Sequence, residues 1–459
     1  MWRISRRDFV KTTGATVAGA ALGLSTRSAW PRDEPSQKPP GVEVLHPQGR
    51  VPLSFIIDDS TCLANMGHFC TPQFHACYPK RPEYQKDWRR WPREIPDAFV
   101  REFGQWCAEH GVKGKYSIVP NPACVGWLDR ELPGWSQREL SASLKLVREL
   151  MLPNWDIHPE MITHTRVIDL KTGRPMREIS PATMENSYPR EKKSADELAA
   201  YLAYALRILK NCDLPCEGVT TPGGFGGLVK PELSLAVQQA VRDVYGAEIP
   251  HYFKYVNTGE GSTEPTLEHL GGLDTNDPRV TVNIPAGTGD WFGGWQGDRQ
   301  PEAHRYANKE ASSGRLVDLI QRNQPAIMLC HWPGMYSNGG KQGFEHFKKV
   351  VTALNGRFRD QTIWMKLSEI ARYWAAKELT RIQQKGTAVT LTAPFATPRF
   401  TLRIAETDGA PPKLTAKDKT IALKRVAKLP ELTTGTWFPD RKGVVVCFDL
   451  PKGESVVTL

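Results

Sequence analysis

Two adjacent carboxylates follow a strongly apolar segment near the start of the chain. Residues 51–57 are mostly apolar and predict a buried strand of a parallel sheet, and Asp58 and Asp59 come directly after it. Charges beside a buried strand cost free energy unless they are paired, solvated or bound to a metal. In α/β folds, functional sites are built at the carboxyl ends of strands. The pair is therefore a candidate for acid–base or metal chemistry, although an Asp that caps the next helix explains it equally well.

Further polar residues follow later predicted strands. They are His164, Asp169, Thr221, Asp290 with Trp291, His331 with Trp332, and Asn338. A structural role explains any one of these residues alone. Because carboxyl ends of parallel strands meet at one edge of a sheet, their convergence on one rim favours a shared site.

Hydrophobic periodicity alternates between strand and helix over most of the chain. Strands are predicted at 51–57, 114–119, 160–168, 217–221, 251–256, 280–284, 326–331 and 362–367, and helices at 96–109, 136–151, 194–210, 231–245, 315–322, 344–354 and 368–379. A long irregular segment, 62–95, follows the first strand. The alternation predicts an α/β fold, a distorted (β/α)7-8 barrel over residues 50–380.

The two ends of the chain differ from this pattern. Residues 386–459 show short alternating runs without a helical period, which predicts a small β-sandwich-like domain. Residues 31–49 are rich in proline and polar residues, and predict an exposed linker. Nine cysteines without a C-x2-C pair predict buried or incidental thiols, with one disulfide permitted.

Five of these segments together resemble the motifs of the polysaccharide deacetylase superfamily, the NodB homology domain. Residues 54–60 (S-F-I-I-D-D-S) resemble its T-F-D-D-G motif, and residues 160–165 (E-M-I-T-H-T) are similar to E-I-x-x-H-T-x-x-H. Residues 221–223 resemble the third motif, 290–291 the fourth and 329–331 the fifth. The resemblance covers residues 50–380 and implies a distorted (β/α)7 barrel.

The resemblance also implies roles for individual residues. Asp58 corresponds to the general base and His331 to the general acid. Asp59 and His164 correspond to ligands of a divalent metal, for which a carboxylate oxygen and an imidazole nitrogen suit zinc.

This chain departs from the family pattern at several positions. The second metal histidine of the family is replaced by Ile168, so Asp169 is the nearest substitute ligand, with His68 and His75 of the long segment as further candidates. The glycine after the paired Asp is a serine, and the arginine of the third motif is Thr221.

Three functions remain open. The first is metal-dependent deacetylation of a polysaccharide or oligosaccharide. The second is cleavage of a glycosidic bond by paired carboxylates such as Asp58 and Asp290, and the third is non-catalytic carbohydrate binding in the periplasm. In each case Trp291, Trp332, Asn338 and Thr221 are candidates for contacts with the sugar.

The N-terminus predicts export. Arg6 and Arg7 precede a weakly apolar stretch, residues 12–24, which is typical of a Tat signal peptide over residues 1–30. We therefore expect the Tat machinery as a partner and a periplasmic or extracellular location. No segment reaches the ~20 apolar residues of a membrane span, and scattered basic residues with a net charge of +10 predict no nucleic-acid partner.

Replacing both Arg6 and Arg7 with lysine should leave the precursor in the cytoplasm, because the arginine pair is the recognised feature of the signal. Cell fractionation with detection of the protein measures this. Arg3→Lys, in the same segment, is the matched control and should be exported normally. Unimpaired periplasmic accumulation of the double variant contradicts the prediction.

Overall fold

The structure, a computed structural model, describes residues 38–405, 411–417 and 419–459. These described residues belong to one compact unit. The predicted signal peptide, 1–30, and the first part of the predicted linker lie outside the described residues.

A parallel sheet surrounds the first predicted strand. Strand β2 (Val51–Asp58) pairs in parallel with β11 (Ala326–His331), β12 (Thr362–Trp364) and β3 (Gly114–Ser117), and β3 pairs with β4 (Trp155–His158). A second sheet has the order β7 (Gly218–Thr220), β8 (His251–Phe253), β10 (Arg279–Asn283) and β9 (Thr266–Gly271), in which only β9 is antiparallel.

Isolated bridges connect the two sheets at both sides. Glu160, just after β4, pairs in parallel with Thr220 of β7, and Asp290 pairs in parallel with Leu329 of β11. These bridges bring the carboxyl ends of strands from both sheets to one rim. The mixed α/β class with a parallel sheet is thus confirmed, and a closed barrel stays a prediction.

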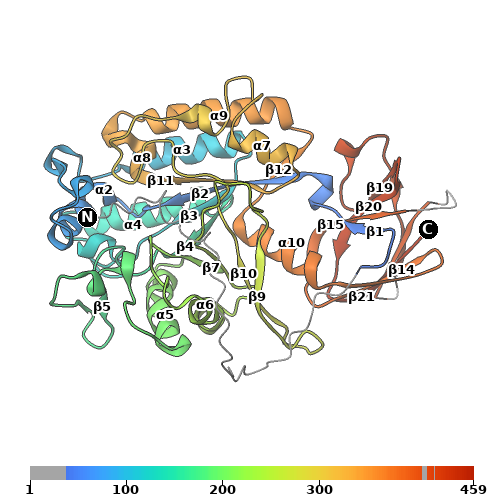
Figure 1. The fold of residues 1–459 in the computed structure, drawn as a ribbon, viewed down its shortest axis with the longest axis horizontal. Coiled ribbons are helices and arrows are strands. Elements are labelled where there is room, and N and C mark those ends of the chain that lie inside the picture. Colours follow the sequence, from blue (N-terminus) through green and yellow to red (C-terminus); the bar gives the residue numbers. More distant parts are fainter. Residues whose placement is uncertain (1–37, 406–410, 418) are drawn as a thin grey trace, which may run out of the picture. The chain divides into compact units, whose positions relative to one another are not determined.

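Amphipathic helices cover the sheets. They are α3 (Asp97–Glu109), α4 (Gln137–Leu146), α5 (Ala195–Asn211), α6 (Lys230–Tyr245), α7 (Arg315–Gln321), α8 (Trp332–Tyr336), α9 (Gln342–Phe358) and α10 (Leu367–Leu379). Figure 1 shows α3, α7 and α9 on one side of β2 and α5 with α6 on the other. Phe55 of β2 stacks on Phe347 of α9 with ring centroids 4.6 Å apart, so β2 is anchored from its outer face.

Two segments differ from their predicted structure. The segment 62–95 contains a helix, α2 (Met66–Cys77), whose N-cap Asn65 accepts a hydrogen bond from the amide of Gly67. An internal proline, Pro72, and the lack of an apolar period hid this helix. The strand predicted at 160–168 is instead the turn after β4, and only the short β5 (Ile168–Asp169) is extended, paired with β6 (Arg174–Pro175).

The C-terminal region consists of two five-stranded sheets. The first contains β1 (Val42–Val44), β15 (Thr397–Ile404), β18 (Lys424–Arg425), β19 (Thr436–Asp440) and β20 (Gly443–Leu450). The second contains β13 (Arg381–Lys385), β14 (Ala388–Ala393), β16 (Lys413–Ala416), β17 (Lys419–Ala422) and β21 (Gly453–Thr458). All nine cysteines of the chain are free.

These sheets are less separate from the rest of the chain than the sequence suggested. Strand β1 lies in the predicted linker 31–49, yet its Val42 and Val44 are buried because it pairs with β15. Trp374 of α10 and Phe400 of β15 belong to the same apolar core as Ile56 of β2. The two regions therefore share buried apolar surface.

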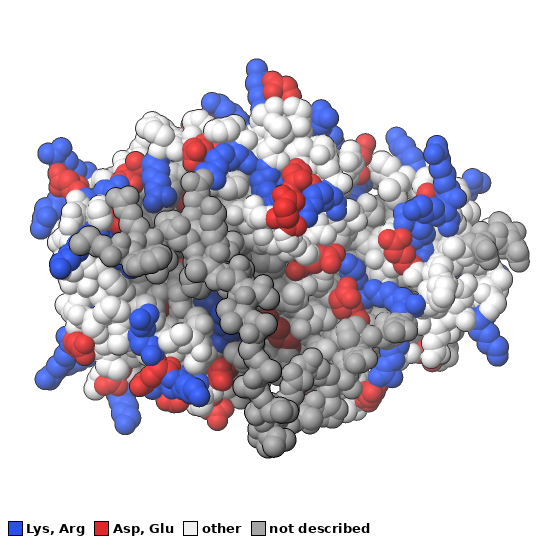
Figure 2. Space-filling view, in the orientation of Figure 1, with Lys and Arg blue, Asp and Glu red and all other residues white. Residues whose placement is uncertain are grey.

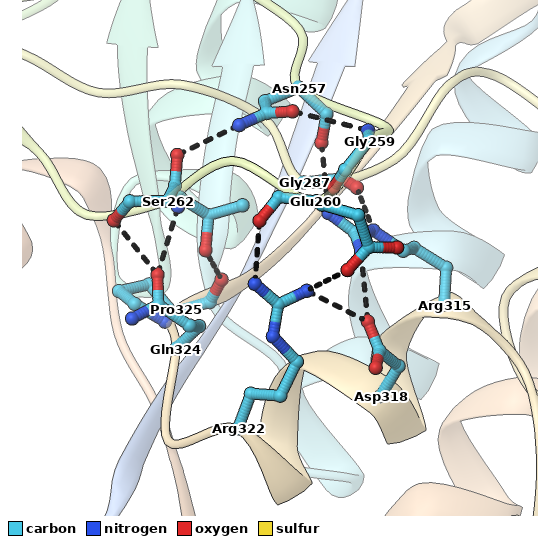
Figure 3. Close-up of polar contacts among 11 residues, drawn as sticks. Asn257, Gly259, Glu260, Ser262, Gly287, Arg315, Asp318, Arg322, Gln324 and Pro325 are labelled. Carbon is cyan, nitrogen blue, oxygen red and sulfur yellow. Dashed lines mark hydrogen bonds and ion pairs between the residues drawn. The ribbon is translucent and has the colours of Figure 1, made fainter.

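A network of arginines fastens the segment between β8 and β9 (Figure 3). Arg315 of α7 donates hydrogen bonds to the backbone carbonyls of Gly287 at 3.1 Å, Asn257 at 3.3 Å and Gly259 at 2.6 Å. Arg322 donates to the carbonyl of Glu260 at 2.7 Å. Because Gly287 leads directly to Asp290, this network also fixes the start of a loop that reaches the rim.

Arg315→Ala should lower the free energy of unfolding by about 1–3 kcal/mol, because it leaves backbone carbonyls without a charged donor. Urea unfolding followed by circular dichroism measures the change. Arg359→Ala, at the exposed end of α9, is the matched control and should leave stability nearly unchanged. Equal midpoints for the two variants contradict a structural role for the network.

Candidate functional site

A buried ion pair lies at the end of β2. Lys115 of β3 is fully buried, and its ammonium group donates to Asp58 Oδ1 at 2.5 Å, to the carbonyl of Ile57 at 3.0 Å and to Ser117 Oγ at 2.8 Å. All three ammonium donors are thus used. Burial raises the pKa of Asp58 to about 6, and the nearby Glu160 carboxylate adds to the rise, while Lys115 opposes it.

Three further side chains form a compact donor cluster. His164 Nε2 lies 2.7 Å from Asp59 Oδ1 and 3.4 Å from Glu160 Oε1, and Glu160 Oε2 accepts the Asp59 amide at 2.8 Å. All three residues are buried, and their ligand atoms lie within 4.8 Å of one another. Two carboxylates and one imidazole suit zinc and other first-row divalent metals, so the cluster fits the metal that the sequence predicted.

Charge and backbone strain concentrate in this cluster. Burial by itself lowers the pKa of His164, but the Asp59 carboxylate outweighs it and holds that pKa well above the usual range. Asp59 has φ of 58° and His164 has φ of 67°, in the left-handed region that non-glycine residues rarely adopt. Such strain persists only where the surrounding structure imposes it, and it gathers at functional sites.

A histidine–aspartate pair completes the rim. His331 ends β11 directly beside Asp58 in the parallel register, and its Nδ1 lies 2.7 Å from Asp290 Oδ2. The other oxygen of Asp290 accepts the amide of Phe292 at 3.0 Å, which fixes the carboxylate. Although burial opposes it, the charges of Asp59 and Asp290 raise the pKa of His331.

The substitute metal ligands proposed from the sequence do not reach the cluster. Asp169 Oδ1 accepts the amide of Lys171 in the β5–β6 hairpin. A ring nitrogen of His68 lies 2.9 Å from the carbonyl of Trp91, and His75 is exposed on α2. Glu160 is instead the third residue that lies together with Asp59 and His164.

A second group of possible ligands lies elsewhere in the described structure. It consists of Asp156, His158 and His251. His158 and His251 already face each other, with their Nε2 atoms 3.0 Å apart, and Asp156 accepts hydrogen bonds from the amide and hydroxyl of Ser368 at the start of α10. These contacts give the three side chains a role within the fold.

The residues predicted to contact a sugar are in different environments. Trp332 is only 1% exposed and packs against Phe99 and Phe103, so it belongs to the core and presents no face to a ligand. Trp291 is half-buried beneath the Arg305 guanidinium, at 4.3 Å from the ring centroid. Asn338 donates to two backbone carbonyls, and Thr221 is buried next to the β7 end.

Comparison with known proteins identifies the N-terminal segment. Residues 3–23 match the model of the TAT (twin-arginine translocation) pathway signal sequence. The chain carries a Tat signal. Export by the Tat pathway to the periplasm or beyond is therefore confirmed. Among the described residues, no helix is long and apolar enough to cross a membrane.

Comparisons with curated proteins and with solved structures give no information about the site, so its geometry and the sequence are the basis for a functional proposal. A search of curated proteins finds no match. A 4-α-glucanotransferase from Thermococcus litoralis aligns at 13% identity and a TM-score of 0.34, over 70% of this chain and 40% of that one. An α-fucosidase from Thermotoga maritima in complex with a mechanism-based inhibitor aligns at 10% identity and a TM-score of 0.31, over 90% and 97%. Scores this low carry no argument about fold or activity.

Sequence reasoning missed three residues around the site. The sequence could have indicated the role of Lys115, because a lysine inside a predicted buried strand needs a partner of opposite charge. Glu160 stood in the motif ahead of His164 but was not considered as a ligand. Glu185 accepts the His164 amide at 2.5 Å, and nothing in the sequence around it indicated this contact.

Lys115→Met should lower the free energy of unfolding by about 3–5 kcal/mol, because it leaves the Asp58 carboxylate buried without its partner. Adding Asp58→Asn should recover part of the loss, since the amide carries no charge. Urea unfolding of the single and double variants measures both effects.

The matched control is Lys113→Met, which removes a lysine that pairs with Glu369 at 3.1 Å near the surface. It should cost about 0–1 kcal/mol. A Lys115→Met variant as stable as this control contradicts the prediction.

Proposed function

We propose that the protein is an exported, metal-dependent hydrolase that removes acetyl groups from a polysaccharide or oligosaccharide. The observation that carries the proposal is the arrangement at the rim. A buried cluster of two carboxylates and one imidazole lies beside Asp58 and beside the His331–Asp290 pair. Carbohydrate as the substrate class rests on the sequence resemblance to polysaccharide deacetylases.

Asp59, Glu160 and His164 are the residues that would hold a divalent cation. When bound, such a cation supplies Lewis acidity toward the acetyl carbonyl and lowers the pKa of a water molecule. The burial of all three ligands keeps competing water away from the donor atoms.

Asp58 and His331 divide the proton transfers between them. Asp58 accepts the proton of the attacking water, and Lys115 holds its carboxylate in place. His331 gives a proton to the leaving amine or oxygen. Asp290 orients the ring through Nδ1 and stabilises the positive charge that the ring carries before it donates.

The glycosidase alternative has less support from these contacts. It requires Asp58 and Asp290 to act as the paired carboxylates. However, Asp290 is bound to His331 and to the amide of Phe292, and Asp58 is bound to Lys115. Both carboxylates therefore already serve other side chains, as expected for one base and one orienting residue.

The test combines metal content with acetate release from a panel of acetylated glycans. Asp59→Ala should lose both the metal and turnover. Asp58→Asn and His331→Ala should retain the metal and lose ~10²–10⁴ in rate, because each removes one proton-transfer group. His75→Ala, on the exposed face of α2, is the control and should retain both.

Three results contradict the proposal. A wild-type protein that binds no divalent metal under any loading condition eliminates this mechanism. Glycan binding without release of acetate, by a protein loaded with metal, supports the non-catalytic function instead. Release of shortened glycans that keep their acetyl groups supports the glycosidase alternative.

A further inference from the structure

The side chain of Glu185, which follows the β5–β6 hairpin in sequence, reaches the turn that carries His164. This side chain is fully buried, and Oε1 accepts the amide of Ile162 at 3.2 Å. Oε2 accepts the amides of Thr163 at 3.0 Å and His164 at 2.5 Å. One carboxylate therefore binds three successive amides, and the last of them belongs to a residue of the donor cluster.

Glu185 is itself held at its side chain and at its backbone. The hydroxyl of Tyr201, on α5, donates to Glu185 Oε1 at 2.5 Å and accepts the amide of Ile168 at 3.1 Å. The amide of Glu185 donates to the carbonyl of Thr165 at 2.7 Å. The turn from Ile162 to Thr165 is thus fastened to α5 through a single side chain.

The conformation of this turn needs such an external support. Met161 has φ of 52° and His164 has φ of 67°, and residues held in sparsely populated regions cost of order 1–3 kcal/mol each. Successive amides that converge on one anion form a stable concave arrangement. Hydrogen bonds to an ionised acceptor are about twice as strong as neutral ones. Burial raises the pKa of the Glu185 carboxyl to about 7, but the hydrogen bonds from Tyr201 and from the Thr163 and His164 amides favour its ionised form, in which it supplies that acceptor.

We propose that Glu185 is a positioning residue, which directs the imidazole of His164 toward Asp59 and Glu160 and thereby sets the metal affinity of the site. This inference rests on the metal site of the proposed function. Glu185 acts on His164 through its backbone amide, which it accepts at 2.5 Å. Groups that orient a ligand in this way typically contribute 10–100-fold to metal affinity.

A purely structural role is the alternative. A buried carboxylate with four donors stabilises the chain whether or not a metal binds. That role predicts a lower melting temperature for a Glu185 variant. The positioning role predicts in addition a weaker affinity for the metal in the protein that remains folded.

The experiment measures Zn²⁺ affinity of the full-length folded protein by competition with a chromophoric chelator, together with the melting temperature of the metal-free form. Glu185→Gln should bind Zn²⁺ 10–100-fold more weakly, because its amide group opposes at least one of the three backbone amides. Tyr201→Phe should show a smaller loss, since all three amide bonds remain.

Matched controls separate positioning from general destabilisation. Glu139→Ala removes the capping box of α4, and Tyr245→Phe removes a hydroxyl that donates to the carbonyls of Leu206 and Leu214. Both should lower the melting temperature and leave Zn²⁺ affinity unchanged.

The outcomes distinguish this inference from the proposed function. Wild-type Zn²⁺ affinity in folded Glu185→Gln overturns the positioning role while the metal site stands. If Glu185→Gln does not fold, the Zn²⁺ affinity of Tyr201→Phe is the test instead, and wild-type affinity in that variant overturns the positioning role. A wild-type protein without Zn²⁺ affinity overturns the proposed function, and the positioning role with it.

Discussion

The structure depends on how it neutralises three buried carboxylates at one end of its parallel sheet. Asp58, Asp59 and Glu160 lie close enough that their charges raise one another's energy in a medium of low polarity. Lys115 compensates the first and His164 the other two. Strand β3 must hold Lys115, and the turn after β4 must hold His164, within hydrogen-bonding distance, so the register of β3 and the charge balance are linked. A shift of one residue in β3 would turn Lys115 to the other face.

The sequence predicted the elements whose signal is local. The apolar runs of β2 and β11 are visible without a structure, and the polar residues after them, Asp58 and His331, do lie side by side. Helices with capping boxes, such as α5 after Ser194, were placed to within a residue or two. The parts that failed depend on distant contacts. Val42 and Val44 are exposed in every local interpretation, because only β15 buries them.

In the candidate site, too, the sequence predicted the residues with a local signal and missed those that depend on distant contacts. His164 was identified from its motif, but its turn was predicted as a strand because positive φ values at non-glycine residues leave no mark on hydrophobic periodicity. Glu185 could not be found, since its role comes from a carboxylate that reaches back to the turn across the β5–β6 hairpin. Trp332 was counted as a sugar contact because aromatic composition does not distinguish core from surface.

The pairing of β1 with β15 constrains the order in which the chain can be made and moved. Val42 lies opposite Ile404 in the register of β1 and β15, so β1 finds its partner only after the ribosome has made the chain as far as Ile404. The Tat pathway carries proteins that have already folded, and this chain bears its signal. In a chain that ends before β15, Val42 and Val44 would stay exposed, shortly after the signal in the sequence. Burial of β1 is thus a structural sign, already present before export, that synthesis has passed β15.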